Sequence, residues 1–246
     1  MTGPSPGDGP FEGRCAVVTG ASRGIGRAIA AMLCRSGATV LLVARNPSGL
    51  DAAVAAAGKA AAGLALDIAE AGAGGRILDF SLQRFGRIDI LVHAAGTMTL
   101  GTMADTTLPA LDEMLDVNVR APYAITRAAL AELRRTQGQV LFINSSIIRA
   151  ANIAGRGGYA ATKHALKAVA DSLRDEVNEH GVRVISLIPG TTATDGQERL
   201  HKAAGKPYRP ERLLQPEDVA RAACDALALP RTAEVTDLHI RPMQKS

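Results

Sequence analysis

The sequence predicts one doubly wound α/β domain with a mostly parallel sheet and helices on both faces. Three observations carry this prediction: short apolar runs recur along the 246 residues, segments with helical apolar spacing separate them, and hydrophobic residues reach 47% of the composition. Strands that alternate with helices in this way form βαβ units and a parallel sheet. Right-handed crossovers then bring the carboxyl ends of the strands, and the loops after them, to one edge.

Composition and charge argue against several classes of partner and cofactor. The net charge is +4 and the basic residues are dispersed, without a tract that would indicate nucleic acid or anionic lipid as a partner. The three cysteines lie far apart with no CxxC pair, and the five histidines lack ligand spacing, so we expect neither disulfides nor a metal. No run approaches the roughly 18 apolar residues of a membrane span. We therefore expect a soluble, cytoplasmic protein.

Residues 1–13 are polar and rich in Gly and Pro, without the basic and apolar regions of a signal peptide. They predict a flexible N-terminal tail. Residues 14–246 contain no internal repeat, low-complexity block or linker, which predicts a single domain for the rest of the chain.

The first predicted strand, residues 15–19, ends in a glycine-rich turn, and a helix follows to about Ser36. Such a turn lets the backbone approach a pyrophosphate, and the N–H groups of the helix point at the anion. The second strand, residues 38–44, ends without an acidic residue; Arg45 follows it, and Arg23 lies in the glycine turn. Two guanidinium groups without a carboxylate favour the 2′-phosphate of NADP over NAD, although a solvated loop arginine would look the same.

The elements that follow continue the alternation. Helices are expected at residues 50–57, 75–85 and 216–229, and strands at 62–66, 88–92, 140–143, 182–188 and 234–240. A long helical stretch, residues 108–135, is expected to break around residues 118–122. Its apolar stripe, expected to face the core or a subunit interface, comprises Leu111, Leu115, Val119, Ile125, Ala129 and Leu133. The polar segment 195–212 follows a strand end and predicts a lid over the substrate, although an ordinary surface loop has the same composition.

Candidate catalytic chemistry follows the strand at residues 140–143. Tyr159 and Lys163 stand four apart, so a helix places their Cβ atoms about 5–6 Å apart on one face. A fixed ammonium beside a phenol lowers its pKa, so that the phenol can give or take a proton. Ser146, thirteen residues before Tyr159, could hold a carbonyl or carbinol oxygen. A half-buried tyrosine, a solvated lysine and a serine turn would leave the same pattern, and the neighbouring glycine turn favours the catalytic interpretation.

Together these motifs resemble the short-chain dehydrogenases/reductases, over about residues 13–242. The matching motifs are the turn Thr19 to Gly26, Asp67, Ala95-Gly96, Asn118-Val119, the set Ser146, Tyr159 and Lys163 at the family's intervals, and Pro189-Gly190 with Thr194. The resemblance implies a Rossmann-type sheet of about seven parallel strands. It also implies a homodimer or homotetramer assembled through the helices around residues 111–135 and 158–179.

The resemblance implies a role for each site residue. Tyr159 would be the general acid/base, and Lys163 would lower its pKa and bind the nicotinamide ribose. Ser146 would position the substrate oxygen, and Asn118 would hold a water in a proton relay from Lys163. The implied cofactor shell is Gly20, Ser22, Arg23, Gly24, Ile25, Gly26, Arg45, Asp67, Ile68, Ala94, Ala95, Gly96, Tyr159, Lys163, Pro189, Gly190, Thr192 and Thr194.

The expected function is therefore that of an NADPH-linked oxidoreductase acting on a small carbonyl or secondary alcohol. Two alternatives stay open: an NADP-binding sensor or scaffold without turnover, and a lyase or epimerase that uses the nicotinamide transiently. The chain departs from the family at His93-Ala-Ala-Gly96, where Asn-Asn-Ala-Gly is usual, and lacks the C-terminal glycine pair common in ketoacyl-reducing relatives. Five basic against three acidic residues in segment 195–212 suggest an anionic substrate, although a solvated face explains the same charges.

Overall fold

The computed structural model describes residues 9–203 and 205–244. Its centre is a seven-stranded, all-parallel sheet with the order β3-β2-β1-β4-β5-β6-β7. Each central strand is a nearly continuous buried apolar run, as a parallel sheet covered on both faces requires. The predicted fold class is confirmed. The strands are β1 (Cys15–Thr19), β2 (Thr39–Ala44), β3 (Ala61–Ala65), β4 (Ile90–His93), β5 (Gln139–Ile143), β6 (Arg183–Pro189) and β7 (Asp237–Ile240).

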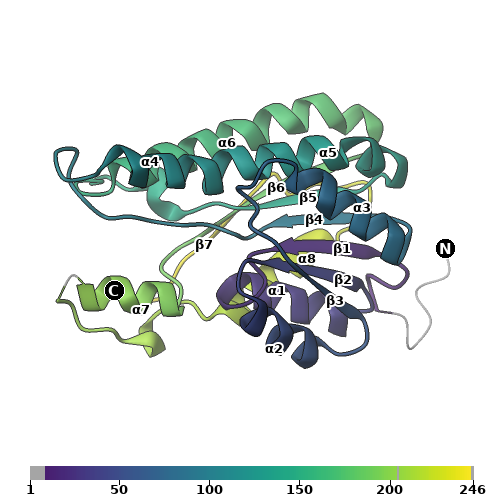
Figure 1. Cartoon of the computed structure of the whole chain (residues 1–246), viewed down its shortest axis with the longest axis horizontal. Helices are drawn as coiled ribbons and strands as arrows, with labels where there is room; N and C mark the ends of the chain where they lie inside the picture. Colours follow the sequence, from purple (N-terminus) through teal and green to yellow (C-terminus); the bar gives the residue numbers. More distant parts are fainter. Residues whose placement is uncertain (1–8, 204, 245–246) are drawn as a thin grey trace.

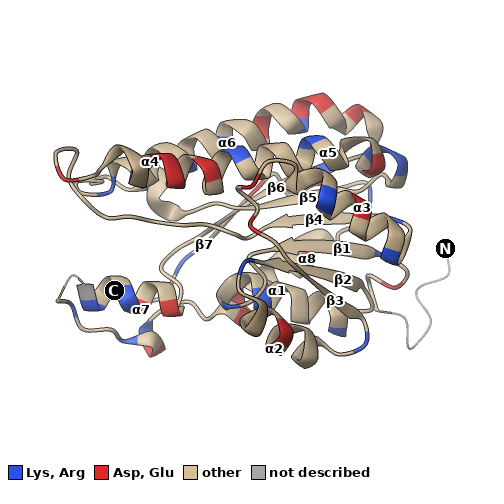
Figure 2. Ribbon diagram, in the orientation of Figure 1, with Lys and Arg blue, Asp and Glu red and all other residues tan. Residues whose placement is uncertain are grey.

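Helices cover both faces of the sheet (Figure 1). On one face lie α1 (Gly24–Arg35), α2 (Pro47–Ala57) and α8 (Pro216–Leu227). On the other lie α3 (Ala73–Phe85), α5 (Ala121–Thr136) and α6 (Gly157–Val177). Alternate strand residues enter the two cores: Val18 and Leu42 face α1, whereas Val17 and Leu41 face the opposite layer. Charged residues lie mainly on the helices and loops (Figure 2).

Two shorter helices complete the carboxyl edge of the sheet. They are α4 (Leu108–Leu115) and α7 (Asp195–Ala203), the latter within the polar segment expected to form a lid. Across the described residues, no helix combines the length and the apolar character needed to cross a membrane.

The predicted break in the long helical stretch is wrong. The backbone stays helical from α4 into α5 through a π-helical turn, η1 (Asp116–Arg120). Pro122 lies in the first turn of α5, where its missing N–H costs little. The wider turn buries Asn118, which is 1% exposed, and π-helical turns of this kind are frequent at functional sites.

The segment before β1 packs against the domain from Gly9 onward, ahead of the boundary expected at residue 14. Phe11 is 3% exposed and belongs to the core on the α1 face, and its amide donates to the Ser36 carbonyl at 3.0 Å. Residues 1–8 of the expected tail lie outside the described residues.

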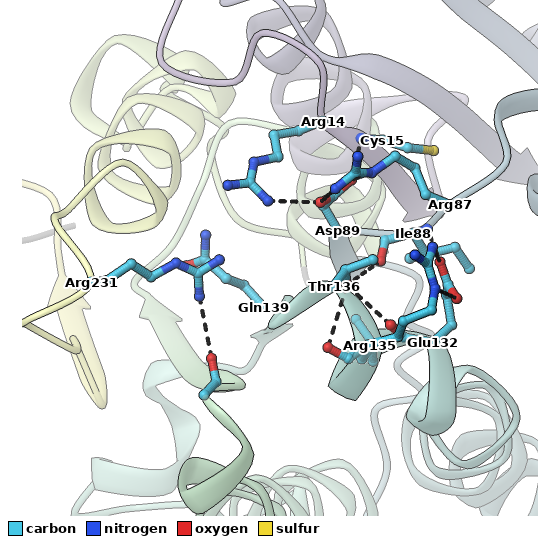
Figure 3. A network of polar contacts seen from close by, with 12 residues as sticks. Arg14, Cys15, Arg87, Ile88, Asp89, Glu132, Arg135, Thr136, Gln139 and Arg231 are labelled. Atoms are coloured by element: carbon cyan, nitrogen blue, oxygen red, sulfur yellow. Dashed lines mark hydrogen bonds and ion pairs between the residues drawn. The ribbon is translucent and has the colours of Figure 1, made fainter.

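A buried carboxylate organises the amino edge of the sheet, opposite the loops that follow the strands (Figure 3). Asp89 is 2% exposed and accepts hydrogen bonds from the Arg14 and Arg87 guanidinium groups at 2.7–2.9 Å and from the Cys15 amide at 2.9 Å. Burial raises the pKa of Asp89, but these three donors outweigh it and the pKa is lowered overall. The carboxylate therefore ties the start of β1 to the start of β4.

Replacing Asp89 with Ala is expected to lower the free energy of unfolding by about 2–3 kcal/mol, because the Cys15 amide and two guanidinium groups lose their acceptor. Asp79→Asn, on the exposed face of α3, is the control and should change stability by less than about 0.5 kcal/mol. Urea unfolding of both variants at neutral pH measures the difference. Since the pKa of Asp89 is lowered on folding, its stabilisation should be present at neutral pH and fade in acid. Equal unfolding midpoints would contradict the assignment.

Candidate active site

The candidate site lies where the order of the strands reverses, between β1 and β4. The last residues of these strands, Thr19 and His93, are paired, so the loops after them start side by side. Ligands of doubly wound sheets bind in the crevice at such a switch point. A cleft of about 1880 Å³ opens there, lined by the loops that follow the strands and by segment 195–213.

Glycines bring the first loop into close contact with the loop after β4. A Cβ on Gly20 would lie 2.6 Å from the Ala95 Cα, and Gly20 also has φ +67°. A Cβ on Gly26 would lie 2.5 Å from the Gly20 carbonyl oxygen. In the described part of the chain, no side chain caps the N-terminus of α1 at Arg23, so its first N–H groups remain available for an anion.

The charges at the ends of β2 and β3 partly neutralise each other. Nη1 of Arg45 lies 3.6 Å from Oδ2 of Asp67, and the Arg45 side chain is 60% exposed. Arg23 is also exposed and lines the same end of the cleft. Both arginines therefore lie where the sequence predicts binding of the 2′-phosphate. The charge of Arg45, however, is partly neutralised by the Asp67 carboxylate.

Lys163 lies buried against the end of β5, next to Tyr159. Its Nζ donates to the Ile143 carbonyl at 3.0 Å and lies 5.8 Å from the centre of the Tyr159 ring. Burial lowers the pKa of Lys163 to about 8. Burial also raises the pKa of Tyr159, while a hydrogen bond with the Ser145 side chain opposes the rise only in part. The phenol is therefore neutral at pH 7 and has a proton to donate.

The Ser145 side chain lies near enough to the Tyr159 hydroxyl to oppose the rise in its pKa, an effect that Ser146 does not have. Ser145 follows β5 by two residues and is partly buried, whereas Ser146 is exposed, although both line the cleft. The Ser145 hydroxyl also accepts from the Ile147 amide at 3.3 Å and caps the short 3₁₀ helix η2 (Ser146–Arg149). Spacing from Tyr159 predicts Ser146 for this role, whereas the side chain that affects the pKa of Tyr159 is that of Ser145.

Asn118 lies behind the wall of the cleft and braces it. Its Nδ2 donates to the Thr97 carbonyl at 2.8 Å and to Oγ1 of Thr162 at 3.1 Å, and its Oδ1 accepts from the Thr97 amide at 2.9 Å. A Cβ on Gly96 would lie 3.4 Å from the Asn118 Oδ1 and 3.9 Å from the Lys163 Nζ. Asn118 and Lys163 thus flank Gly96. Thr97 and Thr162 were not predicted, since a threonine alone carries no motif.

His93 connects the sheet to α5 at the position where the family usually has asparagine. Its Nε2 lies 2.8 Å from Oγ1 of Thr126, and its ring stacks on Phe142 at 4.9 Å between centroids. Burial lowers the pKa of His93 to about 3, so the ring is neutral. The side chain is therefore a structural brace between β4, β5 and α5.

The cleft gathers the predicted site residues from segments far apart in the sequence. Every predicted cofactor residue lines it, together with Ser146, Tyr159 and Lys163; Asn118 alone among the predicted residues does not. Several lining residues were not singled out from the sequence: Arg27, Asn46, Gly49, Ser145 and Arg156. Arg199, Lys206 and Arg209 also line the cleft and lie in segment 195–212, which was expected to form a lid. A doubly wound sheet with this glycine turn and cleft defines the class of nucleotide-binding α/β proteins.

Comparison with known proteins narrows this class. A family model described as short chain dehydrogenase matches residues 14–205. A glycine betaine reductase of Emericella nidulans is 34% identical over 95% of this chain, which spans only 19% of that reductase. An alcohol dehydrogenase of the archaeon Thermococcus sibiricus, solved with 5-hydroxy-NADP, is 31% identical with a TM-score of 0.83, covering 95% of this chain and 98% of that one.

A second solved structure is similar in fold but holds a different cofactor. The 3-ketoacyl-(acyl-carrier-protein) reductase from Brucella melitensis, complexed with NADH, is 26% identical with a TM-score of 0.84, covering 94% of this chain and 97% of that one. The chain belongs to the short-chain dehydrogenase/reductase family of oxidoreductases.

Proposed function

We propose that this protein is an NADPH-dependent reductase that converts a small carbonyl compound to a secondary alcohol, with Tyr159 as the proton donor. The observation that carries the proposal is the arrangement at the end of β5. There a neutral phenol, a hydroxyl from Ser145 and the buried ammonium of Lys163 meet on a cleft that also contains the glycine turn. This set can donate a proton to a carbonyl oxygen while hydride reaches its carbon.

The residues on the cleft fit a dinucleotide. The uncapped start of α1 would receive its pyrophosphate, and a Cβ on Gly24 would lie 3.2 Å from the Thr194 Cγ2, so only a small residue leaves that wall open. Arg23 and Arg45 would bind the adenosine-side phosphate, and Tyr159 and Lys163 would lie at the nicotinamide end. When bound, the nicotinamide supplies the hydride.

The chain's own residues handle the substrate oxygen. The Ser145 hydroxyl would hold that oxygen within reach of the Tyr159 hydroxyl, which gives up its proton as negative charge develops. Lys163 would stabilise the resulting phenolate, because its ammonium is fixed by the Ile143 carbonyl and no carboxylate among the described residues pairs with it. Asn118 would hold the loop at Thr97 and helix α6 in fixed positions beside Tyr159 and Lys163, through its hydrogen bonds to Thr97 and Thr162.

A screen of cofactor oxidation tests the proposal. Ketones, keto-esters, aldehydes and sugars are offered with NADPH and NADH side by side, and loss of the reduced cofactor's absorbance is followed. We expect turnover with at least one carbonyl class and faster turnover with NADPH. Tight NADPH binding without turnover across the panel would overturn the proposal.

Preference for NADPH depends, in this proposal, on Arg45. Arg45→Asp is expected to raise the KM for NADPH at least about tenfold while changing that for NADH much less, because a carboxylate repels the 2′-phosphate. Lys59→Asp is the matched control, since Lys59 is exposed near the amino end of β3 and does not line the cleft. Unchanged selectivity in Arg45→Asp would refute the phosphate role.

A further inference from the structure

The cleft carries a second group of cations, away from the glycine turn and the ends of β1 to β3. These cations come from two segments that are distant in the sequence, the loop before α6 and the segment 195–212, here named the lid. The group comprises Arg156, Arg199, Lys206 and Arg209. Among the described residues of these two segments, Asp195 is the only acid that lines the cleft. Arg212 lines it too and hydrogen-bonds to Gln244.

Contacts within the lid determine where its cations lie. Its two ends are joined at the base, because the Ala193 amide donates to the Leu214 carbonyl at 2.7 Å and the Leu214 amide to the Thr191 carbonyl at 3.1 Å. The rings of His201 and Tyr208 pack edge to face at 5.5 Å and hold its two limbs together. Figure 2 shows Lys and Arg positions along α7, which stands beyond the carboxyl edge of the sheet.

The lid also contains acids, but three of its cations are not paired with them in the described structure. Arg199, Lys206 and Arg209 make no side-chain hydrogen bond or ion pair within residues 9–203 and 205–244. Elsewhere many exposed cations are paired, as Arg76 is with Glu70 at 2.6 Å. Within the described chain, four cations without an ion pair and one acid, Asp195, line this part of the cleft, and such an excess of positive charge on a concave surface creates a potential that attracts anions.

Arg156 connects this charge to the reacting centre. It lies three residues before Tyr159, at the N-terminal cap position of α6, and its Nη2 donates to the Asn152 carbonyl at 2.5 Å. The guanidinium is therefore fixed in the loop before α6, and Arg156 and Tyr159 both line the cleft.

We propose that the substrate carries a carboxylate or phosphate group, bound by Arg156 and the lid cations while its carbonyl lies at Ser145 and Tyr159. This inference rests on the proposed reductase function and specifies its substrate class. Guanidinium groups bind both anions through paired hydrogen bonds, and lysine adds a point charge. The neutral ester of a keto acid would lose these contacts while keeping the carbonyl.

The test compares matched neutral and anionic carbonyls. The pairs are acetoacetate with methyl acetoacetate, levulinate with methyl levulinate, and dihydroxyacetone phosphate with dihydroxyacetone, so that carboxylate and phosphate are distinguished. Each is assayed with the wild type, with Arg199→Gln/Arg209→Gln and with Arg156→Gln. Lys202→Gln is the control, because Lys202 belongs to the lid but does not line the cleft.

We expect kcat/KM to favour the anionic member of at least one pair, and each cleft variant to lower that value about tenfold or more. The neutral member and Lys202→Gln should change by less than about twofold. Reduction of neutral ketones with no anion preference, or a rise in the KM for NADPH alone, would overturn this inference and leave the reductase function standing. Turnover of no carbonyl would overturn the reductase function itself.

Discussion

Tyr159→Phe is expected to lower kcat/KM for carbonyl reduction by about 10²–10⁴-fold, since the variant removes the one hydroxyl that can protonate the substrate oxygen. The phenyl ring keeps the contact with Lys163, whose Nζ lies 5.8 Å from the ring centre. The site should therefore keep its shape and its affinity for NADPH. Steady-state kinetics and a fluorescence titration with NADPH measure the two quantities separately.

Tyr123→Phe is the matched control for this experiment. Tyr123 lies on α5 with 58% of its surface exposed, outside the cleft, and the same atom is removed. Both variants should unfold at temperatures close to that of the wild type. A Tyr159→Phe protein that retains full turnover would show that the proton comes from elsewhere. Loss of activity with loss of NADPH binding would instead indicate a structural role for the hydroxyl.

Motifs that depend on backbone geometry could be predicted well from the sequence. Gly20 and Gly26 occupy positions that tolerate no Cβ, so the glycine turn and its strand and helix follow from the residues themselves. Apolar runs located all seven strands, with ends displaced by at most three residues and both ends of β1 predicted without displacement. The glycine turn and the apolar strands are set by neighbouring residues in the sequence, and packing of the sheet stabilises the same local structure.

Features that depend on contacts between distant segments could not be predicted in the same way. The π-helical turn at Asp116–Arg120 has only five residues, too few for a recognisable hydrophobic period in the sequence. Its effect is to bury Asn118, which then hydrogen-bonds to Thr97 and Thr162. Asp89 looked like one polar residue within an apolar run. Its partners Arg14 and Arg87 meet it because β1 and β4 are neighbours in the sheet.

Helix α7 is an intermediate case, because its start carries a readable signal. Oγ1 of Thr194 accepts from the Gln197 amide at 3.2 Å, in a Thr-x-x-Gln sequence of the kind that begins helices. The polar composition of the segment hid this helix, since most helices are recognised by an apolar stripe and α7 lies at the edge of the molecule.

The position of the serine shows why spacing along a chain and position in space can differ. Lys163 is anchored to the Ile143 carbonyl, so the end of β5 and the start of α6 are fixed relative to each other. The loop between them, which includes Gly155 at φ +69°, can change length without moving either end. Counting back from Tyr159 through this loop reaches Ser146, whereas the side chain that affects the pKa of Tyr159 is that of Ser145.

Ser145→Ala is therefore expected to lower kcat by about 10²–10³-fold, the usual cost of removing one group that stabilises charge on a reacting oxygen. Ser146→Ala should change kcat less than about threefold, because that side chain is exposed and makes no hydrogen bond to Tyr159 in the described structure. The two variants differ by one position and remove the same atom. The ratio of the two kcat values shows which hydroxyl acts on the substrate, because the variant with the lower kcat has lost that hydroxyl.

Ser145 also caps a 3₁₀ turn, and a structural cause of the loss must be separated from a chemical one. Ser145→Thr keeps a hydroxyl and should recover a large part of kcat, whereas a lost cap alone would change the melting temperature and the KM for NADPH together. If Ser146→Ala proved the damaging variant, Ser146 would be the hydroxyl that holds the substrate oxygen, and the role proposed for Ser145 would be wrong.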